Sequence, residues 1–97
     1  MIQDFSDDGT RDIWNGENTK DARRTLPGEL WKVAQRRLAY LHHAATIGDL
    51  AKSPGAGLEK LKGDRDGQHS VRVNEQYRVC FRWTEAGPAD VEIVDYH

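Results

Sequence analysis

The apolar residues of this sequence recur at two different spacings, one before residue 48 and another after residue 69. The most regular set before residue 48 has the spacing of one face of an amphipathic helix and consists of Leu30, Ala34, Leu38, Leu41 and Ala45. Pro27 suits the first turn of this helix, because its missing N–H would be unpaired there. Gly48 is the predicted stop. We therefore predict one long helix over 27–48, followed by a loop at 53–57.

A shorter helix is expected closer to the N-terminus. The side-chain oxygens in the segment 7–10 (Asp-Asp-Gly-Thr) can cap it, Ile13 and Trp14 give it an apolar side, and Gly16 can end it. Residues 2–5, with two apolar side chains, form a candidate short strand ahead of this helix.

From residue 69 the apolar period becomes two, which predicts strands. Residues 69–73 and 77–83 alternate in this way, and the three residues between them suit a hairpin connection. A third strand is expected around 91–95, after a turn at 85–88. Sequential strands with short turns predict an antiparallel meander, and the helices ahead of them make the fold α+β.

The middle strand has two different faces. One face carries Tyr77, Val79, Phe81 and Trp83, and the other carries Arg78, Cys80 and Arg82. We expect the long helix to pack on the first face, which leaves Arg78 and Arg82 on an open face roughly 13 Å apart. Arginines placed in this way can contact successive phosphates of an extended strand. Alternatively, they form cross-strand ion pairs with Glu75, Glu92 or other acidic residues.

Length and composition narrow the class of protein. The 97 residues fit one domain spanning 1–97. With one cysteine the chain has no internal disulfide framework or multi-cysteine zinc site, which favours a cytoplasmic location. The first ten residues lack the pattern of an export signal, and no apolar stretch is long enough to span a membrane.

The net charge of −2 conceals an uneven distribution. Residues 1–19 have a balance of −4, residues 20–42 of +4, residues 58–82 of +2 and the last fifteen residues of −4. Two basic blocks therefore lie between acidic ends. Such blocks suit contacts with phosphates, although a solvated surface of mixed charge gives the same composition.

The end of the sequence, VEIVDYH, combines strand residues with polar chemistry. Val91, Ile93 and Val94 can dock this strand in the sheet and so hold the residues that follow. Asp95 lies two residues from His97, and its negative charge favours the imidazolium form of that histidine. A protonated histidine is a useful general acid near neutral pH.

Other candidate chemistry is weak. The four histidines, including the adjacent pair His42 and His43, lack a metal-ligand spacing, so we predict no metal site and no cofactor. Cys80 lies between two arginines that could lower its pKa, but no neighbouring base marks it as a nucleophile. We therefore expect a structural thiol.

Three segments together resemble a known toxin family. LKGDRDGQHSVRVNEQYRVCFRW, the ending VEIVDYH and the opening MIQDFSDDGTRDIWNG resemble the HigB-type toxins, the plasmid maintenance killer proteins of the RelE-like superfamily. The resemblance implies a compact domain of two N-terminal helices packed on a small, mostly antiparallel sheet. It also implies ribosome-dependent, metal-independent cleavage of mRNA by an endoribonuclease. A helix-turn-helix antitoxin of the HigA type would restrain this toxin in an oligomeric complex.

The resemblance also assigns roles to individual residues. The catalytic set it implies is Lys62, Arg78, Asp95, Tyr96 and His97. Some relatives have a histidine where this chain has Glu59; a carboxylate could act as a base but would not stabilise negative charge, so Glu59 is set apart from the other five. The expected contacts to RNA and the ribosome are Arg23, Arg24, Arg65, Arg72 and Arg82.

Two other functions remain open at this point. A non-catalytic toxin of the RelE/ParE superfamily would inhibit DNA gyrase, although relatives of that kind lack the terminal Asp-Tyr-His. A module that binds an antitoxin or nucleic acid without chemistry would need only the basic blocks. Cleavage of RNA in a translation extract separates the enzyme from both.

Overall fold

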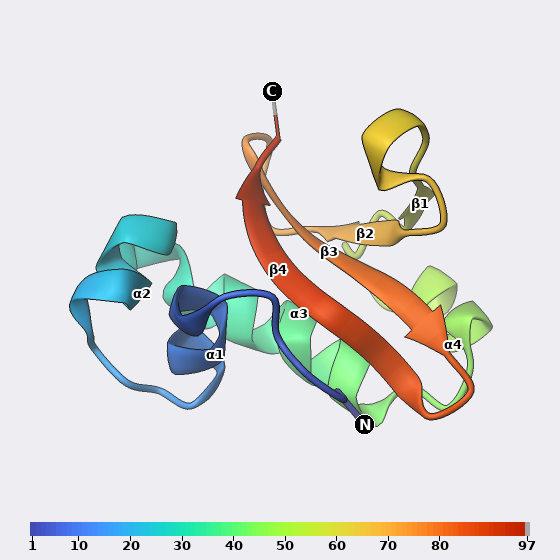
Figure 1. The fold of residues 1–97 in the computed structure, drawn as a ribbon, viewed down its shortest axis with the longest axis horizontal. Helices are drawn as coiled ribbons and strands as arrows, with labels where there is room; N and C mark the ends of the chain where they lie inside the picture. The colour runs from blue at the N-terminus through green and yellow to red at the C-terminus, as the bar shows by residue number, and fades with distance from the viewer. Residues whose placement is uncertain (97) are drawn as a thin grey trace.

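The second half of the chain forms an antiparallel sheet in the strand order β1-β2-β3-β4 (Figure 1). The computed structural model describes residues 1–96. Its strands are β1 (Glu59–Lys60), β2 (His69–Arg72), β3 (Tyr77–Thr84) and β4 (Gly87–Asp95). The predicted meander is confirmed, and β1 adds a two-residue strand that is too short to show a period.

The helices of residues 1–96 come from the first half of the chain. They are α1 (Asp8–Trp14), α2 (Lys20–Thr25), α3 (Trp31–His43) and α4 (Ile47–Lys52), with short 3₁₀ turns η1 (Gly28–Leu30) and η2 (Gly63–Arg65). The α+β class is confirmed, but the expectation of two helices was wrong. The missed helix α2 is capped by Thr19, whose hydroxyl accepts from the N–H of Ala22.

The predicted helix over 27–48 was too long at both ends. Residues 28–30 form η1, and α3 ends at His43 because the backbone becomes extended at Ala44. A capping box then starts α4, since Thr46 and Asp49 each bond the other's backbone N–H. Gly48 therefore lies inside α4 instead of ending a helix.

Strand β4 begins earlier than predicted and carries a bulge. Pro88 pairs with Trp83 near the start of β4, where a proline is tolerated. The register then shifts, and Asp90 adopts a positive φ of 53°. Here the N-terminal segment joins the sheet: Phe5 forms a parallel bridge with Val91, so the candidate strand at 2–5 contributes one isolated bridge.

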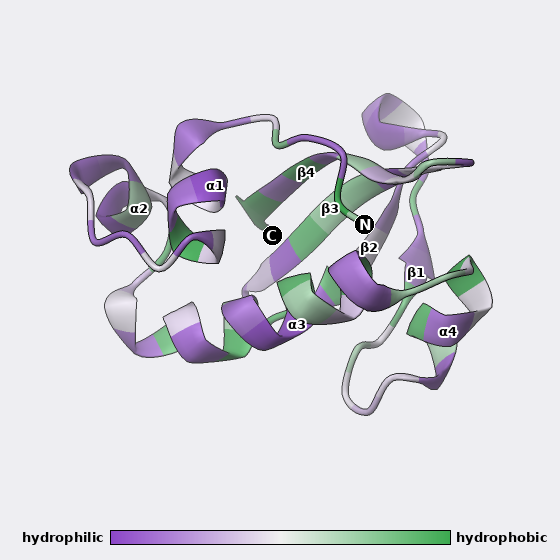
Figure 2. Cartoon of the chain, turned by 90° about the horizontal axis from the view of Figure 1, so that it is seen from below, coloured by the Kyte–Doolittle hydropathy of each residue, from purple (hydrophilic) through white to green (hydrophobic). Residues whose placement is uncertain are grey.

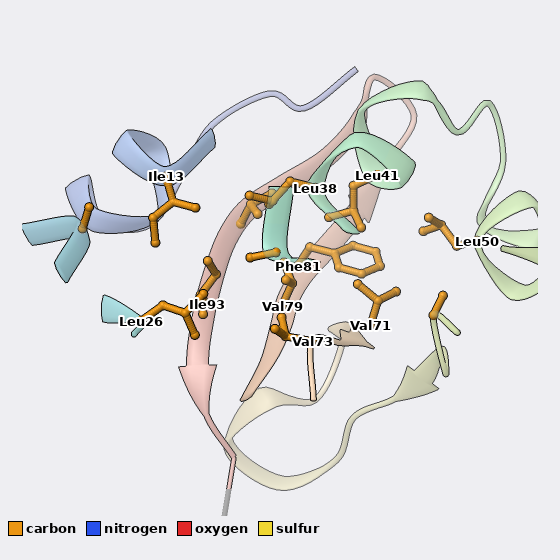
Figure 3. Packing of buried hydrophobic residues seen from close by; sticks show 14 residues of the cluster. Ile13, Leu26, Leu38, Leu41, Leu50, Val71, Val73, Val79, Phe81 and Ile93 are labelled. Carbon is orange, nitrogen blue, oxygen red and sulfur yellow. The ribbon is translucent and has the colours of Figure 1, made fainter. Parts of the chain in front are cut away.

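The core lies between the helices and one face of the sheet (Figures 2 and 3). Helix α3 runs along this face and buries Ala34, Leu38 and Leu41. Val79 and Phe81 of β3 are fully buried against the same cluster, with Tyr77 and Trp83 at its margin. The predicted apolar face of β3 is therefore confirmed.

The opposite face of the sheet is less open than predicted. Cys80 lies on this face and is fully buried, and Leu61 is buried as well, although neither belongs to the main core cluster. The segment 61–68 contains η2, whose Arg65 pairs with Glu92, the cross-strand partner of Cys80. Arg65 of this segment therefore reaches the part of the face that contains Cys80.

We predict that Gly9→Ala will lower the free energy of unfolding by about 1–3 kcal/mol, because overpacking forces shifts in a close-packed interior. A Cβ at Gly9 would lie 1.9 Å from Thr25 Oγ1 and 2.7 Å from the carbonyl oxygen of Asp21, so α1 and α2 would have to separate. Gly48→Ala is the control, since Gly48 lies exposed in a helix and its Cβ would meet only ordinary contacts. Urea denaturation should show a lower free energy of unfolding for Gly9→Ala and no decrease for Gly48→Ala. Equal changes in the two variants would contradict the packing argument.

Candidate functional site

Arg78 is held in place by groups from three parts of the chain. Its Nε donates to Ser70 Oγ at 2.7 Å, and its Nη2 donates to the carbonyl oxygen of Gly57. Its Nη1 lies 3.8 Å from Glu59 Oε1. The side chain is only 11% exposed. Arg78 is therefore a fixed cation, whereas the prediction was a freely displayed one.

Arg72 lies directly opposite Arg78 in the β2–β3 pair. Cross-strand partners share a face of the sheet, and like charges placed opposite each other are destabilising. Arg72 is exposed, and Glu59 is 57% exposed, so solvent weakens the ion pair that could offset this repulsion. The edge of the sheet at Arg72 and Arg78 is therefore electropositive.

Arg37 of α3 supports this edge from the helix side. Its Nε donates to the carbonyl oxygen of Arg72 at 2.8 Å, and its Nη1 donates to that of Pro54 at 3.4 Å. The N–H of Arg72 in turn donates to the carbonyl oxygen of Ala56 at 2.6 Å. These bonds fasten the loop 53–57, whose last carbonyl accepts from Arg78.

Asp95 and Tyr96 lie beside the start of β3, and Asp95 directly follows Val94, the register partner of Arg78. Asp95 is the register partner of Tyr77, and its Oδ2 accepts from Gln76 Nε2 at 3.0 Å. The N–H of Tyr96 donates to the carbonyl oxygen of Gln76 at 2.7 Å, and Tyr96 as a whole is 41% exposed. The predicted triplet is thus anchored as far as Tyr96; His97 lies outside the described residues.

Lys62 lies away from this group. It is exposed and follows β1, three residues beyond Glu59, which corresponds to roughly 10 Å along the strand direction. Since β1 runs in the same direction as β3, Lys62 lies on the opposite side of Glu59 from Tyr96. The structure therefore brings Glu59 and Arg78 together, whereas Lys62 lies apart from both.

The other predicted contact residues are mostly engaged. Arg82 pairs with Asp90 across the bulge at 2.9 Å, and Arg65 pairs with Glu92 at 3.2 Å. The alternative of cross-strand ion pairs therefore holds for Arg82, whose partner is an acid other than Glu75 and Glu92. Arg23 donates to the side chain of Asn18 at 2.8 Å and remains exposed, as does Arg24.

Cys80 is a buried thiol. Burial raises its pKa, Glu92 adds to the rise, and the nearby Arg65 and Arg78 oppose it. A raised pKa suppresses the thiolate that a nucleophile or metal ligand needs. This agrees with a structural thiol.

Two further properties concern the whole described chain. Among residues 1–96 no three His, Cys, Asp or Glu side chains are grouped so that they could hold a metal ion. No helix in the same range is long and apolar enough to cross a membrane.

Comparison with known proteins identifies the family. The family model described as "RelE-like toxin of type II toxin-antitoxin system HigB" matches residues 3–97. This chain belongs to the HigB-like toxin family. It is 34% identical to Toxin HigB-1 of Vibrio cholerae over 77 residues, 77% of this chain and 81% of that one. It is 33% identical to an uncharacterized protein of Haemophilus influenzae over 63 residues, 65% of this chain and 62% of that protein.

The family assignment confirms the resemblance seen in the sequence. A HigB-like toxin is one component of a type II toxin–antitoxin system, so an antitoxin is its partner. The residues that support Arg78 were missed, namely Ser70, Gly57 and Arg37. Only Gly57 gave a signal, as part of a glycine-rich loop; nothing in a strand pattern marks a serine as an arginine's acceptor.

We predict that Ser70→Ala will lower the free energy of unfolding by about 1.5–3 kcal/mol, because it leaves a charged, partly buried donor without its acceptor. Ser53→Ala is the control, since the Ser53 hydroxyl donates to a backbone carbonyl in an exposed position. Chemical denaturation gives the energies, and the Arg78 Nε–H resonance in NMR reports the bond itself. Loss of that resonance's protection from exchange in Ser70→Ala is expected; an unchanged resonance would contradict the assigned contact.

Proposed function

We propose that this toxin is a ribosome-dependent endoribonuclease that cleaves mRNA in the cytoplasm without a metal ion. The observation that supports the proposal most directly is the fixed guanidinium of Arg78 beside the like-charged Arg72. An RNA phosphate placed between these cations would remove their repulsion. The toxin family supplies the biological setting, because its members are toxins of type II toxin–antitoxin systems.

The chemistry needs three groups. The RNA 2′-hydroxyl attacks the adjacent phosphate once a base removes its proton, cations stabilise the extra negative charge, and an acid protonates the leaving 5′-oxygen. The bond between phosphorus and the 2′-oxygen forms, which closes the cyclic phosphate, as the bond between phosphorus and the leaving 5′-oxygen breaks. No electron acceptor and no metal-bound water are required.

Arg78 is the proposed charge stabiliser. Ser70 and Gly57 orient its guanidinium through neutral acceptors, which leave the positive charge in place. The 3.8 Å separation from Glu59 exceeds hydrogen-bond distance, so a phosphate oxygen could replace that carboxylate as the partner of Nη1. Lys62 is the proposed second cation, reaching the strand on its long, flexible stem.

Glu59 is the proposed base. It is exposed and is the carboxylate that forms an ion pair with Arg78. A carboxylate in this position could accept the 2′-hydroxyl proton while Arg78 binds the phosphate attached to the same ribose. Because its own charge is negative, Glu59 cannot stabilise the negative charge that develops on the phosphate.

The terminal triplet supplies the remaining roles. We propose His97 as the acid, Tyr96 as the ring that stacks on a base, and Asp95 as the group that orients them. Tyr96 is suitably exposed and fastened through its backbone to Gln76. The proposed antitoxin is a helix-turn-helix protein of the HigA type.

The ends of the RNA products test the reaction class. We predict products with 2′,3′-cyclic or 3′-phosphate ends, formed also after chelation of transition metals while magnesium keeps the ribosomes intact. Mapping the 5′ ends of transcripts after brief expression should show breaks within translated regions. A 3′-hydroxyl end would indicate metal-activated water and contradict the mechanism. A change in DNA supercoiling with intact messages would instead indicate a gyrase inhibitor.

His97→Gln tests the acid. We predict a fall of roughly 100-fold in the single-turnover cleavage rate at saturating ribosome concentration, because one proton transfer is lost. Thermal stability and antitoxin binding should change little, since the side chains that dock β4 are intact. Glu85→Gln, at an exposed position in the turn between β3 and β4, is the control and should cleave at the parental rate. A His97→Gln rate within about threefold of the parent would show that another group donates the proton.

A further inference from the structure

The outer side of α3 carries an unopposed row of basic groups. Lys32, Arg36 and His43 are exposed and, with Ala39, lie about 180° around the helix from the buried Ala34, Leu38 and Leu41. We call these four outward-facing residues (Lys32, Arg36, Ala39 and His43) the α3 stripe. Since α3 packs on the sheet with its opposite side, the stripe faces away from the sheet (Figure 2).

The charges of Lys32 and Arg36 in the α3 stripe do not stabilise the helix. Lys32 and Arg36 are four residues apart, where like charges repel, and Lys32 lies near the positive end of the helix dipole. No acidic residue occurs between Trp31 and Thr46. Among residues 1–96 neither Lys32 nor Arg36 has a carboxylate within ion-pair distance. An external anion would offset this repulsion.

A pocket adjoins the end of the stripe. It has a volume of about 420 Å³ and is lined by Ala39, Tyr40, His43, Ala44, Asp49 and Ser53. Asp49 accepts from the backbone N–H groups of Ala45 and Thr46, and these bonds lower its pKa. A permanent carboxylate here repels a phosphate, whereas Tyr40 and His43 offer rings on which a base can stack.

We propose that the α3 stripe and this pocket bind a second stretch of RNA, with phosphates along Lys32 and Arg36 and one unstacked base beside Tyr40 and His43. An acidic peptide would need only the cations. The pocket beside them, which is lined by Tyr40 and His43, gives a base a place to stack and therefore favours RNA. The proposal rests on the proposed function only in naming the ribosome as a source of the RNA. Free mRNA offers the same chemistry.

Charge reversal tests the phosphate contacts. Arg36→Glu should weaken binding to 70S ribosomes at least tenfold at 0.1 M salt and reduce the slope of log K against log salt by roughly 0.7–0.9 for a lost phosphate contact. Lys20→Glu, an equal charge change at an exposed position of α2, is the matched control and should weaken binding less than threefold. Equal losses of ribosome affinity in the two variants would show that only the net charge of the protein matters, and would overturn the proposal.

Filling the pocket tests the base contact. Ala39→Leu places a larger side chain in the pocket and should weaken RNA binding roughly tenfold with an unchanged salt slope, since stacking is lost and the phosphate contacts remain. Ala51→Leu, exposed on α4 and not part of the pocket lining, is the control. Binding of Ala39→Leu equal to that of the control would overturn the base-binding part of the proposal.

Binding measured with three partners distinguishes mRNA from ribosomal RNA as the source of the RNA, and distinguishes both from a surface that binds the antitoxin. A single-stranded RNA oligonucleotide, intact 70S ribosomes and the antitoxin are each titrated with the four variants by fluorescence anisotropy or sedimentation. Loss confined to the oligonucleotide indicates mRNA, and loss confined to ribosomes indicates ribosomal RNA; both support the proposal. Loss confined to the antitoxin would overturn it. If the parent toxin cleaves no RNA yet Arg36→Glu loses RNA affinity, the proposed reaction fails and this inference stands.

Discussion

The guanidinium of Arg78 connects the parts of this molecule on which its candidate chemistry depends. It joins β3 to β2 through Ser70 and to the loop before β1 through Gly57. Both acceptors are neutral, so they fix the orientation of the cation without cancelling its charge. Opposite it lies a second cation, Arg72, and the nearby carboxylate of Glu59 is exposed and too distant for a hydrogen bond. The result is a fixed positive charge at the sheet edge that is only weakly compensated by the exposed Glu59, which favours the binding of an anion.

This arrangement depends on the helix layer as well as on the sheet. Arg37 of α3 bonds the loop 53–57 and the end of β2, and the loop passes so close to it that a Cβ at Gly55 would lie 2.8 Å from Arg37 Nη2. Gly55 also has a φ of +73°, which favours glycine. Burial of α3 therefore sets the position of the loop, and the loop carbonyl sets the position of Arg78. A change in helix packing would reach the site through these bonds.

The sequence predicted the features that follow from local periodicity. Alternation in β3 separated the core residues Val79 and Phe81 from Arg78 and Arg82, and the length of the segment 74–76 predicted the hairpin connection between β2 and β3. Contacts between distant segments were not predictable in this way. The cover over Cys80 comes from a loop that lies beyond Leu61, and the bulge at Asp90 accompanies the docking of residues 2–6 on β4. The split of the predicted long helix had a local signal, the Thr46–Asp49 capping box, which the apolar stripe outweighed.

The net charge of −2 describes this toxin poorly, because the distances over which charges act are shorter than the molecule. Interactions between exposed charges are largely screened beyond about 8–10 Å at physiological salt, whereas the molecule measures 32 × 26 × 24 Å. The acidic residues Asp4, Asp7 and Asp8 gather at a separate pocket near the N-terminus. They therefore reduce the average charge without neutralising either the Arg72–Arg78 edge or the α3 stripe. A chain with a pI near 6.0 can thus carry two positive surfaces on opposite sides of its core. An RNA strand would experience the local charge of the surface it contacts.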